Sequence, residues 1–304
     1  MKPIITLFLI ICSIPIFSAV KLSVIISGKG NQDFLKQLEQ NISNKEFLTH
    51  IKDQKTINAV NQFDRANGFP NQDAIKESQV GKKIEYLVDI SPNDKKLRLL
   101  YPKEMDVVQT WNHLNSDTIE ELLGLLEVEA SVRLLKSLEK PKEDRNIFFF
   151  STGVAGAYKS YLTKGEKITF NFAFDSNKNI QQECYLTILS VASDGQILQV
   201  FPDPKNITKT GRYENCKTQA IENEPSGFKI IPPYGKERYY FLVSKQKIQL
   251  DKKYSIERDV EKNFYYIELL HNKKFKGIQK FVSDVKSNEN DYNLEEVIIE
   301  TREK

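Results

Sequence analysis

The period of the hydrophobic pattern changes near residue 145, and this change limits the possible folds more than any single motif. Before it, short apolar runs such as "KLSVIISG" (21–28) and "IEYLVDIS" (84–91) alternate with segments whose apolar residues recur at helical spacing. After it, apolar and polar residues alternate over short runs that Gly, Pro, Asn and Asp clusters separate. The sequence therefore predicts an α/β region followed by a region of β-strands.

In the first region we expect five strands, over 21–28, 46–51, 84–91, 95–102 and 106–111. Helices are predicted over 31–43, with Asn31 as the cap, over 54–63 and over 72–83. The clearest helix starts at 116, where Ser116 or Asp117 is the expected cap, and it ends before Pro141. Its apolar residues form one stripe that is typical of a core-facing helix: Ile119, Leu122, Leu123, Leu126, Ala130, Leu134 and Leu138.

The second region carries seven strand candidates, at 146–152, 167–175, 184–192, 196–202, 227–233, 237–245 and 294–301. Many short strands with regular turns predict a β-sandwich. Residues 262–287 read as partly helical. Asp194-Gly195 stands between two alternating runs, which is the signal of a tight hairpin; the alternative, a catalytic acid at Asp194, is much less favoured.

The first 19 residues, "MKPIITLFLIICSIPIFSA", have the features of a secretory signal peptide that is cut after Ala19. Lipid attachment at Cys12 is the less favoured alternative, because bulky Ile11 stands where a lipoprotein signal has a small residue. No later segment approaches the roughly 20 apolar residues of a transmembrane helix. We therefore expect an exported protein that is periplasmic, associated with the outer envelope, or secreted.

Two cysteines remain after the signal, Cys184 and Cys216, and in an exported protein such a pair predicts a disulfide. Two unpaired buried thiols are the alternative. The formal net charge is +3, which gives no case for a nucleic-acid partner. The three histidines are scattered and no CxxC spacing occurs, so we expect no metal and no cofactor.

Two motifs come close to a chemical signature without completing it. "GVAGAYKS" (153–160) has Tyr158 where a phosphate loop needs Gly. "DSNKNIQQECYL" (175–186) has Ile180 and Leu186 where a calcium loop needs Gly and Glu. No GxSxG segment is present. We therefore expect no catalytic residues, although the sequence leaves enzymatic activity open.

The second region resembles the bacterial family known as domain of unknown function 4384 between about residues 161 and 248. The similar segments are "YLTKGEKITFNF", "CYLTILSVASDGQILQVFPDP" and "FKIIPPYGKERYYFLVS". The resemblance implies an immunoglobulin-like sandwich on envelope or signalling proteins, and it implies no activity. Its motif residues have structural roles in turns, strand ends and the core, and here they are Gly165, Tyr185, Leu186, Asp194, Gly195, Phe201, Pro202, Gly235, Lys236 and Glu237.

The first region is similar, over about residues 20–140, to the α/β fold shared by the curli-secretion channel family and periplasmic activators of penicillin-binding proteins. The similarity lies in a short helix ending at Gly81-Lys82 and the strand "IEYLVDIS", in which members often have Gly in place of Asp89. Nothing in the chain resembles the amphipathic hairpins of a channel, so pore formation is not implied.

Together these observations predict an α+β protein of two domains, an N-terminal α/β domain followed by an immunoglobulin-like β-sandwich. The expected boundaries are a signal peptide (1–19), the α/β domain (20–140), a charged linker (141–146) and the sandwich with a C-terminal extension (147–304). The expected function is non-catalytic binding or assembly with a protein partner in the envelope. The alternatives are an enzyme, or regulator of one, that acts on the cell wall, and a polysaccharide-binding module.

Overall fold

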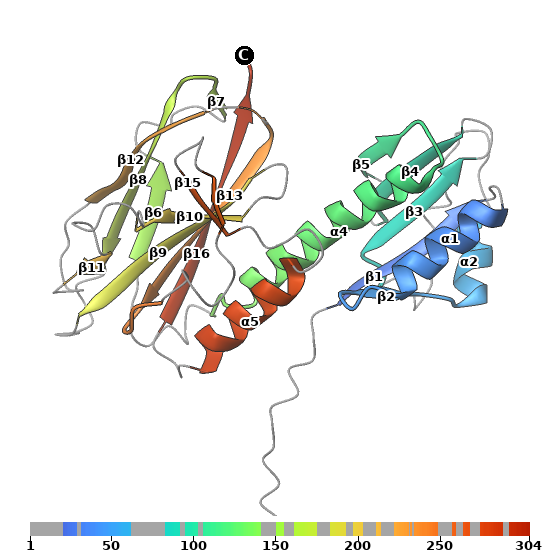
Figure 1. Ribbon diagram of the computed structural model, residues 1–304, viewed down its shortest axis with the longest axis horizontal. Helices are drawn as coiled ribbons and strands as arrows, with labels where there is room; N and C mark the ends of the chain where they lie inside the picture. Colours follow the sequence, from blue (N-terminus) through green and yellow to red (C-terminus); the bar gives the residue numbers. More distant parts are fainter. Residues whose placement is uncertain are drawn as a thin grey trace, which may run out of the picture.

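The computed structural model describes residues 21–28, 32–61, 83–91, 95–102, 106–140, 150–154, 161–174, 183–192, 197–202, 211–213, 222–230, 232, 234–248, 257–259, 264–267, 274–287 and 292–304. Over these residues the protein is mixed α+β, with more strands than helices, and it has sheets of five, eight and three strands. Figure 1 shows that the long helix α4 (Ser116–Lys136) lies between the five-stranded sheet and the strands of the second half.

The N-terminal sheet has the strand order β2-β1-β3-β4-β5. β1 pairs in parallel with β2 and β3, while β3, β4 and β5 are successively antiparallel. The strands are β1 (Leu22–Gly28), β2 (Leu48–His50), β3 (Tyr86–Ser91), β4 (Lys96–Tyr101) and β5 (Asp106–Trp111).

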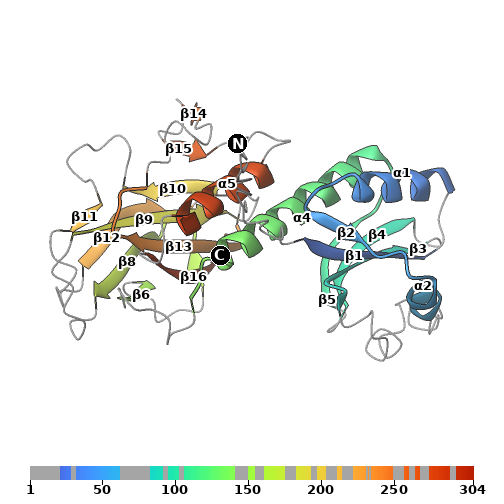
Figure 2. The same cartoon turned by 90° about the horizontal axis from the view of Figure 1, so that it is seen from below.

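Helices cover both faces of this sheet (Figure 2). α1 (Gln32–Ser43) and α4 lie on one face, and α2 (Gln54–Asn61) lies on the other. Val88 and Ile90 of β3 join the core on the α1 and α4 side, whereas Leu87 joins the core on the α2 side. Because successive side chains of a strand point to opposite faces, burial of both faces explains the nearly continuous apolar run of β3.

The large sheet of the second half has the strand order β14-β15-β10-β9-β13-β16-β7, and β11 also pairs with β9. Its strands are β7 (Leu162–Thr163), β9 (Cys184–Val191), β10 (Ile197–Phe201), β11 (Arg212–Tyr213), β13 (Lys236–Ser244), β14 (Glu257–Asp259), β15 (Phe264–Ile267) and β16 (Tyr292–Arg302). The small sheet, of order β12-β8-β6, contains β6 (Phe150–Val154), β8 (Lys167–Phe174) and β12 (Glu222–Lys229).

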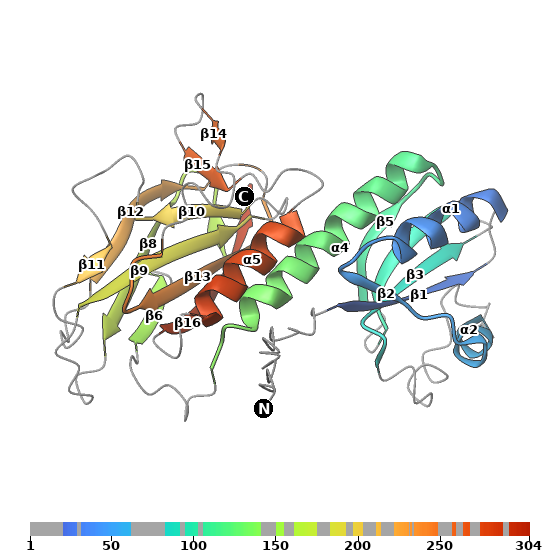
Figure 3. The same ribbon diagram turned by 60° about the horizontal axis from the view of Figure 1, so that its bottom comes forward.

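The large sheet is buried on both faces. On one face Phe170 of β8 packs against Tyr239 and Phe241 of β13, with ring centroids 4.7 and 5.1 Å apart, in a core shared with the small sheet. On the other face Tyr240 and Leu242 of β13 join a core with α5 (Lys274–Ser287) and α4. Figure 3 shows α5 beside the C-terminal part of α4, in front of this sheet.

Helix α4 belongs to the cores of both halves. One apolar cluster runs from the N-terminal sheet along α4 to α5 and the large sheet. Glu127, although charged, is buried on α4, and its Oε1 accepts a hydrogen bond of 3.1 Å from the backbone N–H of Phe275 at the start of α5. A carboxylate there satisfies one of the free N–H groups of the first helical turn.

The structure bears out most of the predicted elements and corrects two details. The cap of α4 is Asn115, whose Oδ1 accepts from the backbone N–H of Thr118 at 2.9 Å, not Ser116 or Asp117. The small-sheet strands are displaced from the predicted ranges, since β6 ends at Val154 and β12 begins at Glu222. The helix predicted at 72–83 lies almost wholly outside the described residues, as does Asn31.

None of the described helices is long and apolar enough to cross a membrane. The signal peptide at 1–19, Cys12 and the linker at 141–146 lie outside the described residues. The boundaries between domains therefore remain predictions.

Candidate functional site

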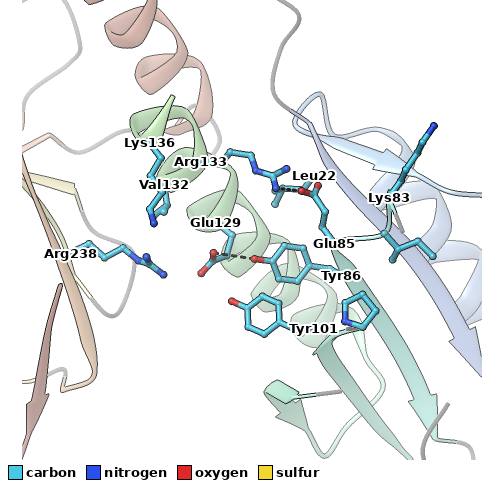
Figure 4. Close-up of a pocket in the computed structure, with 12 residues that line it drawn as sticks. Leu22, Lys83, Glu85, Tyr86, Tyr101, Glu129, Val132, Arg133, Lys136 and Arg238 are labelled. Atoms are coloured by element: carbon cyan, nitrogen blue, oxygen red, sulfur yellow. Dashed lines mark hydrogen bonds and ion pairs between the residues drawn. The ribbon is translucent and has the colours of Figure 1, made fainter. Parts of the chain in front are cut away.

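A pocket of about 650 Å³ lies where the N-terminal sheet, α4 and the large sheet meet. Figure 4 shows its lining: Tyr86 and Tyr101 come from β3 and β4, Glu129 and Lys136 come from α4, and Arg238 approaches from β13. Ligand pockets commonly enclose about 300–1,000 Å³, and this one is within that range. The pocket therefore has the size of a small-molecule or short-peptide site.

The wall nearest the N-terminal sheet contains an ion pair between Glu85 and Arg133. The other carboxylate oxygen of Glu85 accepts a hydrogen bond of 2.8 Å from the backbone N–H of Ser23, which anchors the pair to β1. Burial lowers the pKa of Arg133. These contacts hold both charged groups in place and connect β1, β3 and α4.

The wall nearest the large sheet contains two cations around one carboxylate. The Nζ of Lys136 lies 2.8 Å from Glu296, and a guanidinium nitrogen of Arg238 lies 3.4 Å from it. The hydroxyl of Tyr240 also donates to Glu296, at 2.8 Å. Burial by itself would raise the pKa of Glu296, but these hydrogen bonds and positive charges outweigh burial and lower it.

Between these walls, two tyrosines stand next to Glu129. The Tyr86 hydroxyl donates a hydrogen bond of 3.0 Å to Glu129, and the Tyr86 and Tyr101 ring centroids are 5.3 Å apart. Burial, followed by the charge of Glu129, strongly raises the pKa of Tyr86. Tyr86 therefore remains a protonated donor, and the carboxylate of Glu129 is fixed against an aromatic surface.

A second polar cluster is buried inside the N-terminal sheet, at the ends of β1 and β3. Asp89 is fully buried, accepts a hydrogen bond of 2.9 Å from Ser27, and pairs with Arg98 at 3.2 Å. Burial raises the pKa of Asp89, and the Ser27 hydroxyl and the Arg98 charge offset this increase only in part. Because Asp89 is buried in the sheet interior, its role is in the stability of the fold.

Of the residues singled out in sequence, those that the structure describes do not line the pocket, and they contact structural neighbours. Gly165 adopts a positive φ of 83° in the turn before β8, and Phe201 is buried. The carbonyl oxygen of Gly235 accepts a hydrogen bond of 2.7 Å from the backbone N–H of Thr301 in β16, and the N–H of Gly235 donates to the Thr301 hydroxyl at 3.0 Å. Glu237 accepts a hydrogen bond of 2.5 Å from Tyr239.

Two further described positions are also in or beside strands. Tyr185 is half-buried in β9 and Pro202 directly follows β10. Asp194 and Gly195 lie outside the described residues, but β9 and β10 are antiparallel with Val191 opposite Ile197, as a hairpin requires. Cys184 is fully buried; Cys216 lies outside the described residues, so their disulfide stays a prediction.

Sequence reasoning missed the pocket altogether. Its side chains come from four strands or strand ends and one helix, and no two of them form a known motif. One sequence feature could have pointed to the pocket: the charged residues Glu129, Arg133 and Lys136 lie on a helix that is otherwise rich in apolar residues. Among the described residues, no group of three His, Cys, Asp or Glu side chains could hold a metal ion.

Comparison with known proteins adds no family assignment, because no protein-family model and no curated protein matches the chain. Among solved structures, the crystal structure of TolB from Acinetobacter baumannii is similar with a TM-score of 0.24 and 11% sequence identity. The similarity covers 78% of this chain and 62% of that one, so less than two thirds of the TolB chain is spanned. The class that the structure defines is a mixed α+β protein with a charged, tyrosine-bearing pocket between its two halves.

Proposed function

We propose that this chain is an exported, non-catalytic binding module of the bacterial cell envelope, and that the pocket between β3, β4, α4 and β13 is its ligand site. The single observation that carries the proposal is the pocket itself, with charged and aromatic side chains held by hydrogen bonds and ion pairs at the meeting point of two sheets. Such junctions are frequent positions for ligand sites. The signal-like residues 1–19 support export.

The pocket chemistry favours binding over catalysis. Glu85 is held by Arg133 and a backbone N–H, and Glu129 is held by Tyr86. A general acid or base needs a proton-transfer partner within reach and a pKa near the working pH.

Trp111, the single tryptophan, is buried and donates a hydrogen bond of 2.7 Å to Glu121, so it offers no stacking platform for a sugar.

The finer fold assignment belongs to the same proposal. We infer that residues 147–304 form an immunoglobulin-like sandwich of the type found in domain of unknown function 4384, and that Cys184 and Cys216 form a disulfide. The small sheet packed on the large sheet supports the first point, and the burial of Cys184 supports the second. Peptide mass mapping with and without reduction tests the disulfide directly.

In-cell photocrosslinking tests the function. A photoreactive residue replaces Lys83, which is exposed on the pocket rim, and in a control it replaces Lys55, which is exposed on α2 at the opposite face of the sheet. We expect one recurrent crosslinked species from position 83 and none from position 55. Identical products from both positions, or no product from position 83, would contradict the pocket as the ligand site.

A further inference from the structure

The pocket presents charges of opposite sign at two points along α4, and each has unused binding capacity. The carboxylate of Glu129 accepts a hydrogen bond from Tyr86, and within the described part of the chain it has no ion-pair partner. A half-buried carboxylate beside two aromatic rings is a favourable environment for an organic cation, which can contact the carboxylate and the ring faces together.

At the other point, Lys136 and Arg238 share one carboxylate, that of Glu296. Among the ion pairs of the described residues, these two positive charges share this one negative charge. An ammonium group has three N–H donors and a guanidinium has five, and the contacts to Glu296 use only part of them. The remaining donors can receive a second carboxylate from a ligand.

The spacing of the two points selects the length of the ligand. Glu129 and Lys136 are seven residues apart on one helix, and a rise of 1.5 Å per residue separates them by roughly 10 Å along its axis. The ammonium and carboxylate groups of a single amino acid are attached to the same carbon and cannot span this separation. Three extended residues span at most about 10–11 Å.

We propose that this pocket binds a short peptide of about three residues with both ends free. Its terminal ammonium lies against Glu129, Tyr86 and Tyr101, and its terminal carboxylate lies against Lys136 and Arg238. This inference rests on the proposed function, in which the same pocket is the ligand site, and adds the chemical class of the ligand.

Isothermal titration of the purified chain without residues 1–19 tests the proposal with three probes: trialanine, N-acetyl-trialanine and trialanine amide. Trialanine carries both end charges, while each derivative lacks one. We expect trialanine to bind, and each blocked form to bind at least about tenfold more weakly, since a charge-assisted hydrogen bond contributes roughly 1.5–3 kcal/mol.

Glu129→Gln supplies the matched variant. The amide oxygen of Gln can still accept the Tyr86 hydrogen bond, so the fold is retained while the negative charge is removed. We expect this variant to bind trialanine about tenfold more weakly than the unaltered protein and to leave the already weak affinity for N-acetyl-trialanine unchanged. Glu120→Gln, at an exposed position of the same helix, is the control and should leave both affinities unchanged.

Equal affinity for the three probes would overturn the end-charge recognition and leave the pocket as a peptide site. No binding of trialanine would also overturn the inference. In either case, crosslinking from position 83 separately decides the proposed function, because a crosslinked species of another chemical class would support the pocket as a ligand site without supporting this ligand.

Discussion

Gly28 and Gly124 are glycines in two different backbone conformations, and only one of them requires glycine. Gly28 ends β1 with a φ of 98°, and a Cβ built there would lie 2.0 Å from the carbonyl oxygen of Ile90. Gly124 lies inside α4, and a Cβ built there meets no atom within 4 Å. The first position needs glycine for both conformation and space, whereas the second has no such need.

We therefore expect Gly28→Ala to lower the free energy of unfolding by at least about 2 kcal/mol, from backbone strain and the contact with Ile90. Gly124→Ala should raise it by about 0.5–1 kcal/mol, because alanine is the better helix former. Urea denaturation of both variants measures these changes. Similar effects of the two substitutions would contradict the close approach of β1 and β3.

Asp89 should make stability depend on pH with a defined sign. Burial raises its pKa in the folded protein, so the folded state holds a proton more readily than the unfolded chain does. The stability contributed through Asp89 therefore increases as the pH falls through the folded-state pKa, and it levels off below the unfolded value of about 3.9.

The comparison with Asp89→Asn isolates this dependence. At pH 7 the variant should be at least as stable as the unaltered protein, because the neutral amide avoids the burial of a charge that raises the pKa of Asp89. Between pH 7 and pH 4 the unfolding free energy of the unaltered protein should rise relative to that of the variant. Leu87→Ala, on the same sheet face, is the control with a cost independent of pH. If the difference in unfolding free energy between the unaltered protein and Asp89→Asn did not change with pH, the raised pKa of Asp89 would be ruled out.

At the scale of the element, α4 shows how a helix start is chosen. Asn115, Ser116 and Asp117 are all good capping residues, and the helical periodicity does not distinguish between them. The structure chooses Asn115, whose side chain reaches the N–H and the hydroxyl of Thr118, both at 2.9 Å. Thr118 is buried against the sheet, so tertiary packing decides which of three adjacent residues becomes the cap.

Alanine substitutions test this cap. Asn115→Ala should lower the free energy of unfolding by about 1 kcal/mol, since two hydrogen bonds at the helix start are lost. Ser116→Ala, at the next position and exposed, should change it by less than about 0.5 kcal/mol. Thermal denaturation followed by circular dichroism compares the two. A larger effect at Ser116 would restore the cap predicted from sequence.

At the scale of the whole molecule, α4 packs against both of the regions that the change of hydrophobic period distinguishes. Its predicted apolar stripe is buried as expected, but Glu127, Ser131, Val132 and Leu135 are buried as well. A helix with one covered face needs one stripe, whereas a helix that packs on a sheet at one end and on α5 and a second sheet at the other end is buried more widely.

Because α4 packs against both the N-terminal sheet and the large sheet, we expect these two sheets to unfold in one cooperative transition. Trp111 fluorescence reports on the N-terminal sheet, and far-ultraviolet circular dichroism reports on all strands; the two curves should coincide. Leu135→Ala, near the end of α4, should destabilise by about 2–5 kcal/mol and shift both curves equally.

Glu120→Ala, at an exposed position of α4, is the control for this substitution and should leave both midpoints in place. Two separate transitions, with the Trp111 curve unmoved by Leu135→Ala, would show two independently folding domains. That result would place the boundary within α4, before Leu135, and would contradict the boundary predicted at residues 141–146.

Much of the fold could be predicted from local pattern. The strands β1, β3, β9 and β13 and the helices α1 and α4 follow from alternation, helical spacing and turn residues, because these signals act between residues close in sequence. The β9–β10 pairing was predicted for the same reason, since the Asp-Gly turn joins neighbouring strands.

The candidate site could not be predicted, because its residues are brought together only by packing. Arg238 and Lys136 meet at Glu296, and any two of these three residues are more than 50 positions apart in the sequence. No local rule links them, since the contact depends on how α4 lies across β13 and β16. The sequence alone determined the elements and the alternation of buried and exposed residues, whereas tertiary structure decided which charges are left to face a ligand.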